Sequence, residues 1–166
     1  MQRSRNHYLI FSGLVAIASG LMHIVPIFGG GYWYRLIGAT EPIVAMASKG
    51  HFYPVLVCLV ATAVLFTCAA FAFSGAGYIW RIPLLRTGLV LIACGLIIHG
   101  VAFIPLVLLR PDLMIAVYDG NGINTTLIVI SFICLVTGVT YALGARQAWS
   151  QLRTSGPMPK HPRVGS

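Results

Sequence analysis

Three histidines lie in or beside long apolar stretches of the chain, and their side chains are the best suited to chemistry. His99 stands near the middle of one apolar run, His23 in the later part of another, and His51 at the start of a third. Ionisable groups inside long apolar segments usually face the protein interior. With Glu41 and Asp119 in adjoining segments, the three imidazoles predict one polar pocket.

This pocket has several chemical interpretations and one purely structural one. His23 and His99 could bind copper or another transition metal, ligate a haem, or hydrogen-bond a quinone head. No two histidines have the H-x-x-x-H spacing of a metal-binding helix, so no metal or cofactor is firmly predicted. In the structural interpretation, His23 and His99 donate hydrogen bonds between helices, and His51 lies at an interface.

Other catalytic patterns are missing from the sequence. The Gly29–Gly31 stretch lacks the lysine of a phosphate-binding loop, and the apolar runs contain no Asp, Glu, Lys or Arg. The four cysteines lie inside apolar runs without a C-x-x-C pair, which is typical of buried thiols: Cys58, Cys68, Cys94 and Cys134. The sequence therefore favours a non-catalytic protein over an enzyme.

Four apolar runs must position the candidate side chains. They cover residues 8–28, 52–73, 87–109 and 126–145. About 20 residues in a helix cross a hydrocarbon layer of about 30 Å. Only 8% of the residues are charged, against about 25% in soluble domains. The predicted fold is an all-α polytopic membrane protein, an antiparallel bundle of four transmembrane helices.

Basic residues set the predicted orientation. Of the 11 Lys and Arg residues, eight lie on one side of the predicted membrane: Arg3, Arg5, Arg81, Arg86, Arg146, Arg153, Lys160 and Arg163. Because cytoplasmic segments are enriched in these residues, both termini are predicted to be cytoplasmic. The net charge of +8 then matches anionic lipid headgroups rather than nucleic acid.

The same pattern divides the chain into three parts. Residues 1–7 are predicted to be a cytoplasmic N-terminus, 8–149 the membrane domain, and 150–166 a basic, disordered cytoplasmic tail. In an alternative interpretation, the stretch ending at Ala16–Ala18 is a cleaved signal peptide. The apolar run continues to Phe28, which favours a retained anchor.

A short extra helix is predicted between the first two runs. Thr40 is placed as its N-cap, Pro42 lies in its first turn, and Gly50 stops it. The apolar face of this helix contains Ile43, Met46 and Ala47. Such a face suits a helix that lies on the membrane surface.

Every long run also carries a face of small, weakly polar residues, which close helix packing in lipid requires. These faces are Ser12, Ala16 and Gly20; Val55, Cys58, Thr62 and Ala69; Gly88, Gly95, His99 and Ala102; and Ser131, Cys134, Gly138 and Ala142. They predict a compact antiparallel bundle, and they would equally serve a dimer interface.

Several segments resemble small bacterial four-helix inner-membrane proteins that are broadly DoxX-like in layout. They are Met22–His23, Gly30–Arg35 with Gly38–Ala39, Arg81–Arg86 and Tyr141–Gly144. The resemblance covers about residues 8–150 and carries over no catalytic residue. Some DoxX-type proteins are associated with quinone-linked oxidation or redox-stress complexes.

Two functional hypotheses follow. The first is a non-catalytic or accessory membrane subunit whose partners are the lipid bilayer and either a second copy or another membrane protein. The second is a redox-, metal- or haem-associated membrane protein with an outward-facing histidine pocket.

Overall fold

The computed structural model describes residues 6–110, 112 and 125–149, and every regular element within them is a helix. The long helices are α1 (His7–Gly29), α4 (Phe52–Ala76), α5 (Leu85–Leu109) and α7 (Thr125–Ala148). Two short helices, α2 (Gly31–Leu36) and α3 (Glu41–Ser48), follow α1. The four predicted runs are therefore helices, and each extends beyond its run at one end or both.

All four long helices are long and apolar enough to cross a membrane. Large apolar side chains are exposed along each of them, for example Leu14, Val64, Leu91 and Phe132. Water would disfavour so large an exposed apolar surface, whereas lipid solvates it. The chain is a multi-pass membrane protein with an all-helical, antiparallel four-helix architecture.

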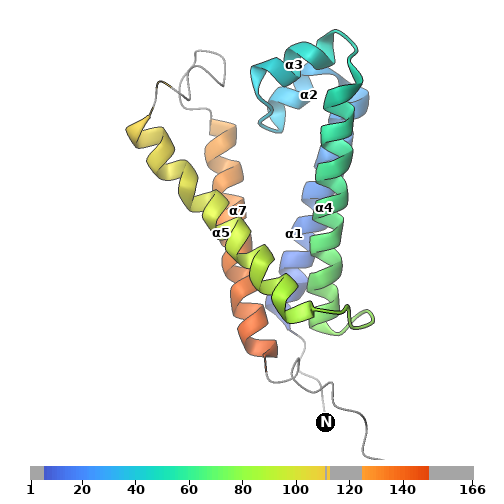
Figure 1. The fold of residues 1–166 in the computed structure, drawn as a ribbon, viewed down its shortest axis with the longest axis vertical. Coiled ribbons are helices and arrows are strands. Elements are labelled where there is room, and N and C mark those ends of the chain that lie inside the picture. The colour runs from blue at the N-terminus through green and yellow to red at the C-terminus, as the bar shows by residue number, and fades with distance from the viewer. Residues whose placement is uncertain (1–5, 111, 113–124, 150–166) are drawn as a thin grey trace, which may run out of the picture.

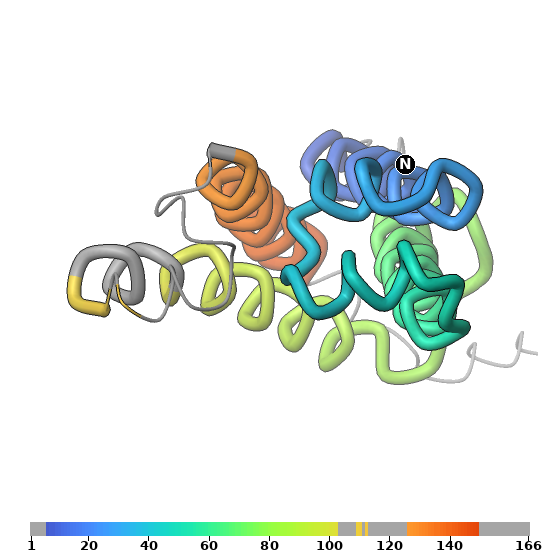
Figure 2. Tube along the Cα trace, turned by 90° about the horizontal axis from the view of Figure 1, so that it is seen from above, coloured from blue at the N-terminus to red at the C-terminus, as the bar shows by residue number. Residues whose placement is uncertain are grey.

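The long helices form two antiparallel pairs, α1 with α4 and α5 with α7, and these pairs are the two arms of a V (Figure 1). The arms meet where α1 begins and α7 ends, which we call the joined end. They diverge toward α2 and α3, which we call the open end. Figure 2 shows the two arms side by side from above, with α2 and α3 over the α1–α4 arm.

Hydrogen bonds and a small core hold the arms together at the joined end. The Tyr141 hydroxyl of α7 donates to the backbone oxygen of Cys68 in α4 over 2.9 Å. The hydroxyls of Ser12 and Thr140 lie 2.8 Å apart, linking α1 to α7. Around these bonds packs a buried cluster from all four long helices: Leu9, Ala72, Leu85, Leu89, Ala93, Tyr141 and Ala145.

Asn6 adds a third link, directly before α1. Its side-chain oxygen accepts from the backbone nitrogen of Leu9, which caps the helix. Its amide nitrogen donates to the backbone oxygen of Gly144 in α7 over 2.7 Å. One buried side chain therefore both starts α1 and ties it to the other arm.

Within each arm, glycines bring the helices close. Gly13 and Gly20 of α1 face the rings of Phe73 and Phe66 in α4. Thr62 of α4 donates a hydrogen bond of 3.2 Å to the backbone oxygen of Gly20. The predicted packing faces of the first two long helices are confirmed, because their members are buried or half-buried.

The predicted packing face of the third run is correct at Gly88, which is half-buried against Phe71 of α4, and wrong beyond it. Gly95, His99 and Ala102 are exposed, and a Cβ at Gly95 would meet nothing within 4 Å. Among the α5 residues whose side chains the structure describes, the buried ones are instead Leu85, Leu89, Ala93 and Gly100. On α7, Ser131 and Gly138 are buried as predicted, whereas Ala142 is exposed.

Helix α3 begins and ends as predicted. Pro42 lies in its first turn, and Gly50, with a φ of 74°, follows its last turn. The backbone nitrogens of Gly50 and His51 return hydrogen bonds to Ala47 and Met46, which closes the helix end. Thr40 occupies the N-cap position, but its side chain makes no capping hydrogen bond.

The apolar face of α3 packs on the protein. Val44 is buried with Tyr34 of α2 and Cys58 of α4, and Ile43 and Ala47 pack against this cluster. The surface-lying helix expected from the sequence therefore uses this face for a tertiary contact that fixes α2 and α3 on the α1–α4 arm.

Candidate functional site

His99 lies on the face of α5 that contacts α4 near the joined end but no longer contacts it where the arms diverge. It follows Gly88 by 11 residues, which is three helical turns, so both residues share one face. A Cβ at Gly88 would collide with the ring of Phe71 in α4. Three turns further on, α5 has moved away from α4 (Figure 1), and His99 is exposed.

His23 occupies the corresponding place on the other arm. It follows Ser12 by 11 residues on α1, and Ser12 contacts Thr140 of α7. His23 therefore lies on the face of α1 that contacts α7 near the joined end and is free of α7 toward the open end. Both histidines belong to the inner faces of the V.

The two histidines also lie at similar distances along their helices from the joined end. Helices α1 and α5 both run from the joined end toward the open end (Figure 1). His23 comes sixteen residues after the first residue of α1, and His99 fourteen after the first residue of α5. At 1.5 Å per residue these positions are about 24 and about 21 Å along their helices.

One ring nitrogen of His23 is occupied. Its Nδ1 lies 2.8 Å from the backbone oxygen of Ser19. A carbonyl oxygen only accepts, so this nitrogen carries the proton and donates. In the neutral ring, Nε2 then keeps a lone pair for a metal, a haem iron or a hydrogen-bond donor.

The structure does not gather the other predicted pocket residues around these two. His51 is exposed at the N-cap position of α4 and makes no capping hydrogen bond. Glu41 pairs with Arg35, with Oε1 2.6 Å from Nη2. Asp119 lies outside the described residues. Among the residues that are described, no three His, Cys, Asp or Glu side chains lie close enough together to hold a metal ion.

Three of the four cysteines fit the prediction of sheltered thiols. Cys58 is buried, Cys68 and Cys134 are half-buried, and all four are free. Cys94 is exposed on the surface of α5. The prediction of a sheltered thiol is therefore wrong for Cys94.

Tyr34 of α2 is a buried residue with a polar group that no sequence pattern marked as functional. Its hydroxyl lies against the Cys58 thiol and makes no hydrogen bond of good geometry within the described chain. Burial and the neighbouring thiol raise the pKa of the Tyr34 hydroxyl, so it stays neutral. No spacing signal could have found this pair, because its members come from α2 and α4.

Comparison with protein-family models, curated proteins and solved structures found no match. The DoxX-like resemblance therefore stays a prediction, and the function must be argued from the arrangement of the helices. Two features carry that argument: the exposed face of α5 and the two histidines on the inner faces of the arms.

Proposed function

We propose that the protein is a non-catalytic membrane subunit that receives a transmembrane helix of a partner against the open face of α5. This open face consists of Gly95, His99 and Ala102. The observation that supports the proposal is the combination of small residues and one exposed imidazole at membrane depth, none of them used for packing within the described chain.

The chemistry of this face matches what membrane helices use to associate. Small residues let two backbones approach closely, and the space beyond Gly95 is empty to at least 4 Å. An imidazole facing lipid is costly, and a hydrogen-bonding side chain on the partner would relieve that cost. The expected partner is an apolar helix with small residues and one polar group opposite His99.

Photo-crosslinking in native membranes tests this proposal. A photoreactive residue is placed at Leu91 or Ile98, which flank the open face, and at Val64 on the exposed side of α4 as the matched control. We expect a protein adduct of defined mass from the first two positions and only lipid adducts from Val64. Gly95→Ile should abolish the protein adduct, because the new side chain fills the contact surface.

The mass of the adduct identifies the source of the helix. An adduct of twice the chain's mass indicates a second copy, and any other protein mass indicates a separate subunit. Lipid adducts alone at Leu91 and Ile98 would overturn the proposal.

A second candidate is a redox role in which His23 and His99 ligate a haem between the arms. It is favoured by their similar distances along α1 and α5 from the joined end and by the lone pair left on Nε2 of His23. Copper or a quinone head would use the same two side chains.

Absorption spectroscopy of the protein purified from haem-supplemented cells tests this second candidate. We expect a Soret band that is lost in both His23→Ala and His99→Ala, because each substitution removes one imidazole that would hold the haem. His51→Ala is the matched control, since His51 is exposed outside the inner faces. Colourless protein, without copper or quinone, would remove this candidate.

A further inference from the structure

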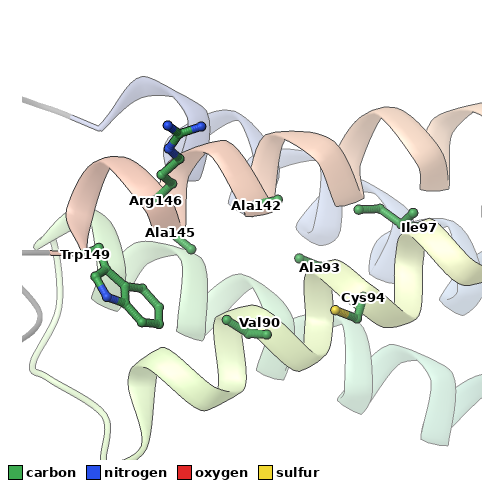
Figure 3. A pocket seen from close by; sticks show the side chains of 8 residues that line it. All are labelled: Val90, Ala93, Cys94, Ile97, Ala142, Ala145, Arg146 and Trp149. Atoms are coloured by element: carbon green, nitrogen blue, oxygen red, sulfur yellow. The ribbon is translucent and has the colours of Figure 1, made fainter.

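A groove runs between α5 and α7 near the joined end, on the side of α5 away from the open face. Its volume is about 400 Å³. Its lining is almost wholly apolar and comes from Val90, Ala93, Cys94, Ile97, Ala142, Ala145, Arg146 and Trp149. Figure 3 shows the small α5 side chains opposite Ala145, with Trp149 and Arg146 toward the same end.

Two arginines mark this end of the groove. Arg146 is exposed on the last turns of α7. The Arg86 guanidinium lies 4.8 Å from the Trp149 ring centroid, and its Nη2 donates to the Trp149 backbone oxygen over 2.6 Å. The buried Nε of Arg86 has no hydrogen-bond partner in the described part of the chain.

The described residues offer no carboxylate to balance these charges at the joined end. Their two acids are Glu41 and Asp112. Glu41 is paired with Arg35, and Asp112 with Arg110, in segments at the open end. Within the described part of the chain, Arg86 and Arg146 therefore have no acidic counter-charge, and an anionic ligand could supply one.

We propose that the α5–α7 groove binds one anionic phospholipid. Its headgroup would lie against Arg146 and the exposed edge of Arg86, at the Trp149 end. An acyl chain would follow the apolar lining from Val90 to Ile97, a rise of about 10 Å along α5. The groove combines an apolar lining with two nearby cations. A phospholipid can satisfy both features, because its acyl chain fills the groove, whereas a free phosphate ion would contact only the cations.

This site is independent of the proposed partner contact. The open face and the groove lie on different sides of α5, and the groove lies at the joined end. Loss of lipid binding would therefore leave crosslinking from Leu91 unchanged, and loss of crosslinking would leave lipid binding unchanged.

Thermal unfolding of the full-length protein in a neutral detergent tests the lipid site. We expect phosphatidylglycerol to raise the melting temperature more than phosphatidylcholine does. Arg146→Gln should weaken the apparent phosphatidylglycerol affinity about fivefold, the effect of one basic residue near a lipid surface. Lys49→Gln, which removes an exposed cation at the open end, should leave the affinity unchanged.

A second measurement uses the position of Trp149. With Trp33 and Trp80 replaced by Phe, brominated phosphatidylglycerol should quench the remaining fluorescence more than brominated phosphatidylcholine does. Cys94→Phe, which fills the groove, should reduce this quenching. Equal effects of the two lipids in both measurements, or displacement of phosphatidylglycerol by inorganic phosphate, would overturn the proposal.

Discussion

Replacing Gly100 or Gly138 by valine is expected to force α5 and α7 apart, whereas Gly95→Val should leave the fold intact. A Cβ at Gly100 would lie 2.8 Å from the backbone oxygen of Ser131. A Cβ at Gly138 would lie 2.9 Å from the backbone nitrogen of Ile97. Backbone atoms cannot rotate out of the way, so the helices themselves must separate.

The expected loss is at least about 1–3 kcal/mol of unfolding free energy for Gly100→Val or Gly138→Val, the usual cost of overpacking. Denaturant titration of the full-length protein in mixed micelles measures it. Gly95→Val is the matched control on the same helix, because its new side chain enters open space. Equal stability of Gly95→Val and Gly100→Val would show that α5 and α7 do not approach as described.

Gly13 offers a graded comparison within the same experiment. Its Cβ would meet only the ring of Phe73, with a closest approach of 2.9 Å to Cζ. Because that ring is a side chain and can shift, Gly13→Ala should cost less than Gly100→Ala. A smaller loss of unfolding free energy in Gly13→Ala than in Gly100→Ala would therefore distinguish a contact with a side chain from a contact with backbone.

Removing the Tyr141 side chain is expected to release the two arms from each other. Tyr141 is completely buried in the core at the joined end, and its hydroxyl reaches across to α4. Tyr141→Ala should cost about 3–5 kcal/mol, the range for removing a buried aromatic ring. Tyr141→Phe keeps the ring and should cost about 0.6 kcal/mol, the average for a hydrogen bond between membrane helices.

Two measurements on the full-length protein check this prediction. Denaturant titration gives the loss of stability, with Tyr8→Ala as control because Tyr8 is about half exposed. Distances between spin labels at Tyr32 and Leu109, at the ends of opposite arms, should broaden in Tyr141→Ala and stay narrow in Tyr141→Phe. If Tyr141→Ala and Tyr141→Phe are equally stable, the joined end does not hold the arms together.

The sequence predicted the elements because their signals are local. A run such as 52–73 is helical in lipid whatever its neighbours do, since its backbone must satisfy its own hydrogen bonds. The extension of this helix to Ala76 follows from Gly77, whose left-handed conformation ends it. Pro42 and Gly50 marked α3 in the same local way.

The arrangement of the candidate site was predictable only in part. Counting residues places His23 and His99 at similar distances along α1 and α5, two helices that run in the same direction. Their separation from His51, and the pairing of Glu41 with Arg35, depend on where the segment between α1 and α4 folds. No spacing within a single segment contains that information.

By itself, the sequence determined that the chain forms four long apolar helices and one short helix between the first two. Only the tertiary structure decided which faces of those helices touch. In water, a buried face is apolar and an exposed face polar, so periodicity reveals the packing. In lipid, both faces are apolar. Contact then depends on how well two helix surfaces fit, and the residues that form them are far apart in the sequence. Gly138 of α7 packs against Ile97 of α5, whereas Gly95 on the same helix α5 packs against nothing.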